Sequence, residues 1–402
     1  MKVPVNMLVA ALALSIVGLP ACSRQKDVEA DGEAVVTPAD EQADAVEEPP
    51  VLEPRELAVK PTEKNVRLVS RTFADDDATW LAQSGSGVEF AAAATRVQVE
   101  IVGDDNVEND PDLRPRFAVL VNGEVVLDDT LSERDRTIEV LEAEDETDAV
   151  VEVMLLSEAN RGIVGVRQIV VESAAETPVT PTEAKPLSIE FIGDSITCAY
   201  GVEAGSADEP FRTTTENFMK SYAYLAAQSL DVDYSTTCYS GYGIVSGWSA
   251  DGSRNDTMLM PPVYDLVADG HDWAWDFSAH PQDVVVINLG TNDSSYTGMD
   301  EGRMWEFSQG YADFLAHVRT CNPDAYLVCT IGTMEGGWLY PYVEQAVESF
   351  KASTGDARVT CYRSDPIDMG ADGCGTGGHP NEITQRKSAD TLVEVVRAVL
   401  AS

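Results

Sequence analysis

Short stretches in which apolar and polar residues alternate fill the chain from residue 61 to residue 173. Val, Ile and Phe alternate there with charged residues, and turn residues separate one stretch from the next. The strongest hairpin signal is Asn122-Gly123, which lies between two alternating runs in "VLVNGEVVL". Alternation with a period of two is typical of half-buried strands. The pattern therefore predicts an all-β domain, a sandwich of jelly-roll type, over residues 61–173.

From residue 187 onward, short apolar runs alternate with amphipathic stretches. The amphipathic stretches predict helices, the last of them in "NEITQRKSADTLVEVVRAVLAS". Strands that alternate with helices indicate a mostly parallel sheet between two helical layers. We therefore expect an α/β three-layer domain of flavodoxin-like type over residues 187–402, after a linker at residues 174–186. The apolar runs predict its strands at Leu187–Ile192, Val232–Thr237, Asp283–Leu289, Ala325–Ile331 and Arg358–Tyr362.

The first 60 residues belong to neither pattern. Residues 1–22 join a lysine to an apolar run too short to span a bilayer, as in an export signal. The run ends in "LPAC", which resembles a bacterial lipobox and makes Cys22 the expected lipidation site; an ordinary signal peptide that contains a cysteine is the alternative. Residues 23–60 are rich in Pro, Ala, Asp and Glu and predict a disordered acidic tether. We expect an exported protein, lipid-anchored to a bacterial membrane at the cell surface or facing the periplasm.

Charge and cysteine content narrow the choice of partners. The formal net charge of −42 at pH 7 repels nucleic acid and anionic lipid headgroups, so we expect neither as a partner beyond the lipid anchor at Cys22. Neutral polysaccharides meet no such repulsion and are compatible substrates. We expect the protein to be a monomer. The six other cysteines permit disulfides without specifying their pairing. Their spacing indicates no CxxC pair and no Cys/His cluster suited to a metal, so we predict neither metal nor cofactor.

Four short segments, each after a predicted strand, carry groups suited to acyl transfer. Ser195 closes "GDS" after the first strand, Gly241 follows the second, Asn292 follows the third, and His379 precedes the last helix. The carboxyl ends of parallel strands share one edge of a sheet, so these groups can converge. A serine becomes a strong nucleophile when an imidazole takes its proton, which predicts Ser195 and His379 as the catalytic pair. The backbone N–H groups of Ser195 and Gly241 and the Asn292 amide are the predicted oxyanion donors.

The other three histidines are poorer candidates for the base. His280 precedes a predicted strand and should lie at the wrong end of the sheet. His317 falls inside a helix pattern, where a solvated or packed role is expected. His271 stands in the Trp-rich stretch "DGHDWAWDF" and is a weak competitor.

Taken together, the four segments resemble the motif blocks of the SGNH (GDSL) hydrolase family, in the family's order. With the preceding β domain, "FIGDSITCAYG" is also similar to carbohydrate esterase family 2, and "WLAQSGSGVEF" and "FAVLVNGEVV" resemble that family's jelly roll. The resemblance implies a metal-free serine esterase that deacetylates xylan- or mannan-type polysaccharides or oligosaccharides through an acetyl-enzyme. The alternatives are a GDSL-type lipase or thioesterase acting on longer acyl esters, and a non-catalytic carbohydrate-binding lipoprotein.

The chain departs from the family pattern beside the histidine. The family usually has an acid two or three residues before it, where this chain has Gly377 and Thr376. The nearest acid, Asp372, lies upstream in a Gly-rich loop and is a candidate third catalytic residue if the glycines let the loop fold back. In some members of the esterase family, a main-chain carbonyl orients the histidine instead.

Three tryptophans and one cysteine complete the candidates. Trp338, after a predicted strand, and Trp248 are candidate sugar-stacking residues, and Trp273 is a similar case; packing in the protein is the alternative for each. Cys198 lies close to Ser195, and we expect it to be a buried thiol or half of a disulfide.

Overall fold

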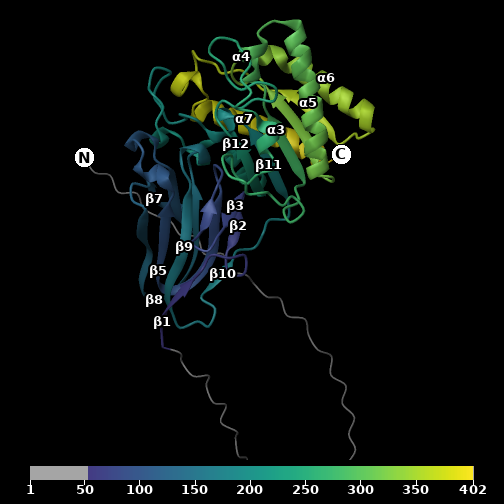
Figure 1. Ribbon diagram of the computed structural model, residues 1–402. Coiled ribbons are helices and arrows are strands. Elements are labelled where there is room, and N and C mark those ends of the chain that lie inside the picture. Colours follow the sequence, from purple (N-terminus) through teal and green to yellow (C-terminus); the bar gives the residue numbers. More distant parts are fainter. Residues whose placement is uncertain (1–52, 402) are drawn as a thin grey trace, which may run out of the picture. The chain divides into compact units, whose positions relative to one another are not determined.

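The computed structural model describes residues 53–401 (Figure 1). The predicted export signal, the predicted lipidation site at Cys22 and the tether up to residue 52 lie outside the described residues. Within residues 53–401, no helix combines the length and the apolar character that a membrane span requires. All six cysteines of this part of the chain are free thiols, so Cys198 is a buried thiol and not half of a disulfide.

The first ten strands form one antiparallel sheet, with the path β3-β4-β9-β5-β8-β6-β7 and three further strands paired to β5 or β9. Every second side chain along its long strands points into the core, as the period of two predicts. The predicted hairpin at Asn122-Gly123 is present between β6 and β7, and both turn residues have positive φ (52° and 81°). The strands are β1 (Arg55–Val59), β2 (Arg67–Val69), β3 (Thr72–Ala74), β4 (Thr79–Leu81), β5 (Gly87–Gly103), β6 (Arg116–Val121), β7 (Glu124–Thr130), β8 (Asp135–Leu155), β9 (Val164–Ser173) and β10 (Val179–Pro181).

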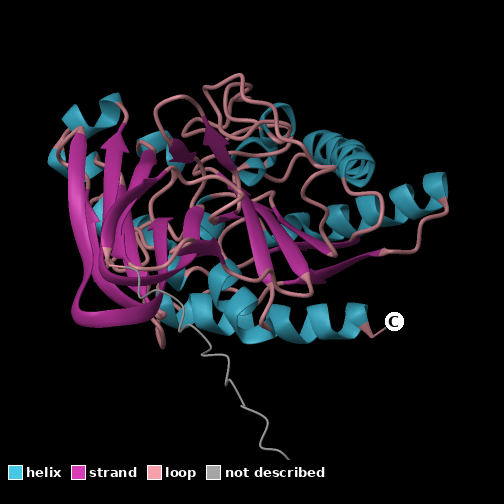
Figure 2. Ribbon diagram, turned by 90° about the horizontal axis from the view of Figure 1, so that it is seen from below, coloured by secondary structure: helices cyan, strands magenta, loops and turns pink. Residues whose placement is uncertain are grey.

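The two longest strands, β5 and β8, pair along most of their length and carry register shifts that bend them. The sheet curls, as its broad strands in Figure 2 show, and encloses a core of Val, Ile, Leu and Phe side chains. This curled, jelly-roll-like sheet confirms the predicted fold class of the first domain.

Two predicted boundaries of this sheet are wrong. Residues Arg55–Val59 were expected to belong to the tether, but they form β1, which pairs with β9 because Leu57 and Val59 pack against the core. Residues 174–186 were expected to be a linker, but Val179–Pro181 forms β10, paired with β5, and Val179 is buried. In both cases a short strand is stabilised by a neighbour far away in the sequence.

The second half of the chain is the predicted parallel sheet, with the strand order β12-β11-β13-β14-β15. This is the flavodoxin-like order, in which the chain switches direction between its first and third strands. The strands are β11 (Ser188–Gly193), β12 (Asp233–Cys238), β13 (Val284–Asn288), β14 (Tyr326–Ile331) and β15 (Val359–Arg363). The helices are α1 (Ser195–Cys198), α2 (Tyr222–Leu230), α3 (Met260–Val263), α4 (Asp293–Thr297), α5 (Glu301–Cys321), α6 (Tyr340–Thr354) and α7 (Glu382–Leu400). Short 3-10 helices are η1 (Asp105–Glu108), η2 (Pro111–Leu113), η3 (Ala159–Arg161), η4 (Thr213–Thr215), η5 (Phe218–Lys220), η6 (Gly337–Leu339) and η7 (Thr376–Gly378).

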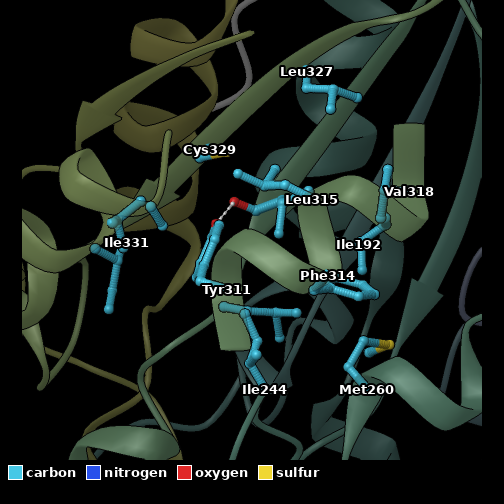
Figure 3. Close-up of a cluster of buried hydrophobic side chains, with 14 of the residues drawn as sticks. Ile192, Ile244, Met260, Tyr311, Phe314, Leu315, Val318, Leu327, Cys329 and Ile331 are labelled. Atoms are coloured by element: carbon cyan, nitrogen blue, oxygen red, sulfur yellow. Dashed lines mark hydrogen bonds between the residues drawn. The ribbon is translucent and has the colours of Figure 1, made fainter. Parts of the chain in front are cut away.

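Helices cover both faces of the parallel sheet. One face packs against α5 and α6, and the other packs against α2 and α7. Figure 3 shows the first of these layers, where Tyr311 of α5 donates a hydrogen bond to the main-chain oxygen of Ile287, 3.4 Å away on β13. The three-layer architecture predicted from the alternating pattern is therefore confirmed, and its switch point lies between β11 and β13.

Candidate active site

Ser195 lies at the start of α1, directly after β11 reaches the switch point. Gly193 permits the sharp turn, because a Cβ there would lie 2.0 Å from Thr197 Oγ1. Asp194 caps the helix, and its Oδ1 accepts a hydrogen bond from the Ile196 N–H at 3.0 Å. The result is a serine held on a short, fixed turn, with 6% of its surface exposed.

His379 lies next to that serine, although 184 positions separate them in the sequence. Its Nε2 is 2.8 Å from Ser195 Oγ, and its Nδ1 is 2.9 Å from the main-chain oxygen of Thr376. A carbonyl oxygen only accepts hydrogen bonds, so Nδ1 carries the hydrogen and Nε2 is free to accept the serine proton. This tautomer is the one that a general base requires.

Asp372 does not complete a triad, and this candidate from the sequence is wrong in the structure. Its carboxylate accepts from Lys387 Nζ at 2.6 and 2.8 Å, and its main-chain oxygen accepts from Asn381 Nδ2. The Gly-rich loop does fold back, with positive φ at Gly377 and Gly378 (61° and 83°), but it turns the Thr376 carbonyl toward the imidazole. The main chain thus orients the ring, as in those members of the esterase family that use a main-chain carbonyl.

The surroundings of His379 hold it in its neutral form. Burial lowers the pKa of His379 to about 4, and the hydrogen bond to Thr376 offsets only part of that effect. At neutral pH the imidazole is therefore unprotonated and able to take a proton from Ser195.

The three predicted oxyanion donors face the same cavity as this pair. Ser195, Gly241, Asn292 and His379 all line a cavity of about 730 Å³. Asn292 Nδ2 donates to the main-chain oxygen of Tyr242 at 2.8 Å and lies 3.3 Å from Asp194 Oδ2. The first contact fixes the amide, whereas the second is long enough for an incoming oxyanion to compete for that hydrogen.

Asp293, the residue after the predicted oxyanion donor Asn292, holds two loops of the site together. The buried carboxylate of Asp293 accepts from the N–H groups of Ile244, Val245 and Ser246 at 2.7 to 3.1 Å. Burial raises the pKa of Asp293 to about 6, and those N–H groups partly offset the rise. The contacts tie the loop after β12, which carries Gly241, to the loop after β13, which carries Asn292. Its position directly after Asn292 was the only signal in the sequence.

The β domain contributes Arg161 to the lining of the cavity, which no motif predicted. Glu158 is fully buried and accepts from the Ser240 N–H at 2.8 Å, next to Gly241. Arg161 lines the cavity, lies 4.9 Å above the ring of Phe211, and has its Nε 3.7 Å from Glu158 Oε1. The curled sheet therefore both braces an oxyanion loop and places a cation at the site.

The candidate tryptophans separate into different environments. Trp248 lines the cavity and is 57% exposed, as a stacking platform would be. Trp338 borders a neighbouring hollow, and its Nε1 donates to the Gly298 oxygen at 2.9 Å. Trp273 is packed, with its ring stacked on Phe73 at 4.1 Å between centroids.

The three remaining histidines have partners away from Ser195. His271 stacks on Trp273 at 3.9 Å, and His280 stacks on Trp275 at 4.2 Å. His317 Nε2 is hydrogen-bonded to Asp265 Oδ1 at 2.7 Å. The structure therefore leaves His379 as the imidazole within reach of the serine.

Comparison with known proteins gives this geometry a context. Residues 191–387 match the GDSL-like Lipase/Acylhydrolase family. Over 219 residues the chain is 35% identical to the cellulase/esterase CelE of Acetivibrio thermocellus, and over 191 residues it is 29% identical to an acetylxylan esterase/glucomannan deacetylase of Cellvibrio japonicus. These matches cover 53% and 43% of this chain but only 26% and 51% of those relatives.

Solved structures match over more of the chain. A family two carbohydrate esterase from Clostridium thermocellum, in complex with cellohexaose, has a TM-score of 0.73 at 27% identity and covers 84% of this chain and 99% of its own. An acetyl xylan esterase from Butyrivibrio proteoclasticus has a TM-score of 0.76 at 20% identity and covers 87% and 99%, a likeness of fold. The shared architecture includes both the curled sheet and the parallel sheet.

Proposed function

Residues 191–387 form a GDSL-like hydrolase domain in a chain built like the family 2 carbohydrate esterases, and from this premise we propose that the protein is a serine esterase that removes O-acetyl groups from carbohydrate. The observation that carries the proposal is the 2.8 Å contact between Ser195 Oγ and His379 Nε2 in a cavity lined by oxyanion donors. Xylan- and mannan-type polysaccharides or oligosaccharides are the proposed substrates.

The first half of the reaction forms an acetyl-enzyme. Ser195 Oγ attacks the acetyl carbonyl carbon while His379 Nε2 takes the hydroxyl proton. The oxygen of the tetrahedral intermediate becomes negative and accepts from the N–H groups of Ser195 and Gly241 and from the Asn292 amide. When the intermediate collapses, the C–O bond to the sugar breaks and His379 returns its proton to the sugar oxygen.

The second half returns the enzyme to its starting state. His379 takes a proton from water, and the resulting hydroxide attacks the acetyl carbon on Ser195. Collapse of this second intermediate breaks the bond to Ser195 Oγ, which regains the proton from His379, and acetate leaves. In both halves the imidazolium is stabilised by the carbonyl dipole of Thr376, 2.9 Å away, in place of a carboxylate.

One feature of the cavity and the comparison with known proteins support a sugar substrate. Trp248 presents an exposed ring on which a sugar can stack. The names of the relatives point the same way, because one is an acetylxylan esterase/glucomannan deacetylase and a solved relative holds cellohexaose.

A longer acyl substrate is the second candidate, and one observation favours it. Three methionines, Met258, Met334 and Met369, line the same cavity, and flexible thioether side chains adapt to apolar chains. A lipase or thioesterase would use the same serine chemistry on such esters.

Turnover of a series of synthetic esters from acetyl to octanoyl separates the two candidates. A deacetylase should have its highest kcat/KM on the acetyl ester and should release acetate from acetylated xylan or mannan. A kcat/KM that rises with chain length, without acetate release from either polymer, would favour the lipase or thioesterase.

We also propose that the enzyme is exported and anchored by lipid at Cys22. The support is the apolar run of residues 1–22 and its "LPAC" ending. Incorporation of labelled palmitate into the full chain in a bacterial host, absent from Cys22→Ala, is the expected result. Equal incorporation into both forms would refute the anchor at this position.

A further inference from the structure

A cluster of three potential metal ligands lies away from the catalytic pair. His317 and Cys321 are one helical turn apart on α5, and Asp265 reaches them from the segment after α3. Asp265 Oδ1 is 2.7 Å from His317 Nε2 and 3.8 Å from Cys321 Sγ, and Sγ is 3.8 Å from Nε2. Among residues 53–401, these three are the His, Cys, Asp or Glu side chains that lie close enough together, as a group of at least three, to bind one ion. The sequence interpretation overlooked the pair, because "HVRTC" becomes a ligand pair only on a helix.

The three atoms are arranged much as a tetrahedral zinc site requires. With Zn–N and Zn–O distances of about 2.0–2.1 Å and Zn–S of about 2.3 Å, tetrahedral geometry separates O from N by about 3.3 Å and S from either by about 3.6 Å. The two separations that involve sulfur are within about 0.2 Å of these values, whereas the Asp265–His317 contact is shorter by about 0.6 Å. Side-chain rotation that opens this one contact would admit an ion. Imidazole, thiolate and carboxylate together form a ligand set suited to zinc.

The backbone around Asp265 is already fixed from several directions. Arg71 Nη1 donates to the main-chain oxygens of Tyr264 and Leu266, both at 2.5 Å, so the residues on either side of Asp265 are held. The main-chain oxygen of Asp265 itself accepts from the Trp275 N–H at 2.8 Å. Because the main chain around Asp265 is held before an ion arrives, binding has to order little more than the side chains of the cluster, which lowers its entropic cost.

The cluster is open enough for water to complete the coordination. The side chains of His317 and Asp265 are 38% and 54% exposed. A zinc ion held by three protein ligands takes its fourth ligand from water, and the exposed side of this cluster leaves room for one.

We propose that Asp265, His317 and Cys321 bind one zinc ion with water as the fourth ligand. Cys321 lies at the end of α5, just before β14, and therefore at the edge of the sheet opposite Ser195, which follows β11. The ion joins the segment after α3 to α5 and strengthens the fold without entering the ester chemistry. Cys321 binds as thiolate, so each ion bound releases the thiol proton to solvent.

Titration of the full, metal-free chain with Co²⁺ as a spectroscopic substitute for Zn²⁺ tests the site. We expect one equivalent to bind with a thiolate-to-cobalt charge-transfer band, and one equivalent of Zn²⁺ to displace it. Cys321→Ala should abolish the band. His317→Gln should weaken binding by at least about 100-fold, because loss of a residue that only supports a metal ligand already costs about 10- to 100-fold in metal affinity. Cys361→Ser and His271→Gln, which alter a thiol and an imidazole elsewhere, should bind as the parent does.

Stability and activity supply the second readout. Zn²⁺ should raise the Tm of the parent and of the two control variants but not that of Cys321→Ala. Turnover of a short ester should be the same with and without the ion, since the cluster does not contact the catalytic pair. The absence of the charge-transfer band in the parent chain would overturn the proposal even if a variant failed to fold. Equal binding by Cys321→Ala would overturn it too, because the ion would then sit on the acidic surface.

Discussion

The Nδ1 of His379 donates a hydrogen bond to the main-chain oxygen of Thr376, 2.9 Å away, where a serine hydrolase with a full triad has a carboxylate. A carbonyl fixes the tautomer and the direction of the ring, as a carboxylate does. It carries only a partial charge, so it stabilises the imidazolium less and raises the pKa of the imidazole less. We propose on this basis that the site works as a serine–histidine pair assisted by a main-chain dipole.

Replacement of the nearby acid should have little effect on catalysis. Asp372→Asn keeps the size of the side chain and removes its ion pair with Lys387, which is exposed to solvent. We expect kcat to stay within about twofold of the parent, because the Asp372 carboxylate contacts Lys387, whereas His379 Nδ1 bonds to the main-chain oxygen of Thr376. Steady-state kinetics on a short ester measure this, with Lys387→Met as the matched control. A fall of two orders of magnitude for Asp372→Asn alone would restore it as a third catalytic residue.

The pH dependence should follow the lowered pKa of His379. The base acts when it is unprotonated, and burial lowers its pKa to about 4 from the usual 6.5. Protonation therefore removes activity only as the pH falls toward 4, so kcat/KM should stay near its plateau from pH 7 to about pH 5. A profile that already halves near pH 6.5 would contradict the buried, neutral imidazole.

The lowered pKa of His379 also makes the free energy of unfolding depend on pH, so stability has to be measured alongside activity. The unfolded chain binds a proton on this histidine below pH 6.5, whereas the folded chain does so only near pH 4. The contribution of His379 to stability is thus present above pH 6.5 and is lost as the pH falls toward 4. Circular dichroism at each pH distinguishes loss of fold from protonation of the base.

Removal of one oxyanion donor should lower turnover strongly. Asn292→Ala deletes the amide that faces the cavity, and the loss of one such donor costs about 10²–10³ in kcat. KM should change much less, because the donor acts mainly on the tetrahedral intermediate. Kinetics on an acetyl ester measure both constants. Ser295→Ala, on the same cavity but outside the oxyanion donors, is the control, and an equal fall in kcat for it would point to damage of the loop instead.

Two of the exposed tryptophans, Trp248 and Trp338, should differ in their contribution to polysaccharide binding. Trp248 faces the cavity and Trp338 does not, so Trp248→Ala should raise KM for acetylated xylan while Trp338→Ala leaves it near the parent value. An aromatic contact worth about 0.5–1.5 kcal/mol corresponds to a change of about two- to tenfold. KM for a short synthetic ester should be unchanged in both. The same KM for polysaccharide in both variants would exclude Trp248 as a stacking platform.

Much of the fold follows from local patterns. The five parallel strands, the jelly-roll-like sheet and the Asn122-Gly123 hairpin each carry a periodicity or a turn signal of their own. The strands β1 and β10 carry little such signal, because each has only a few residues and depends on a distant partner, β9 or β5. Their boundaries were therefore mistaken.

The residues of the candidate site likewise fall into those that the sequence predicts and those that it does not. Ser195, Gly241, Asn292 and His379 follow strands of the predicted sheet, and topology alone brings them to one edge. Which group faces His379 Nδ1 depends instead on backbone dihedrals in a glycine-rich loop, which composition does not specify. The contact of Glu158 with Ser240, the place of Arg161 at the cavity and that of the Asp293 carboxylate between two loops depend on tertiary contacts that no spacing reveals.

The central claim is that Ser195 carries out the deacetylation. Acetate released from acetylated xylan or mannan by the full chain, beside its Ser195→Ala and Ser240→Ala variants, tests it most directly. The account predicts steady release by the parent and by Ser240→Ala, and release by Ser195→Ala that is slower by several orders of magnitude, with only the part that the oxyanion donors and substrate binding sustain. Release by a folded Ser195→Ala variant at the rate of the parent would contradict it.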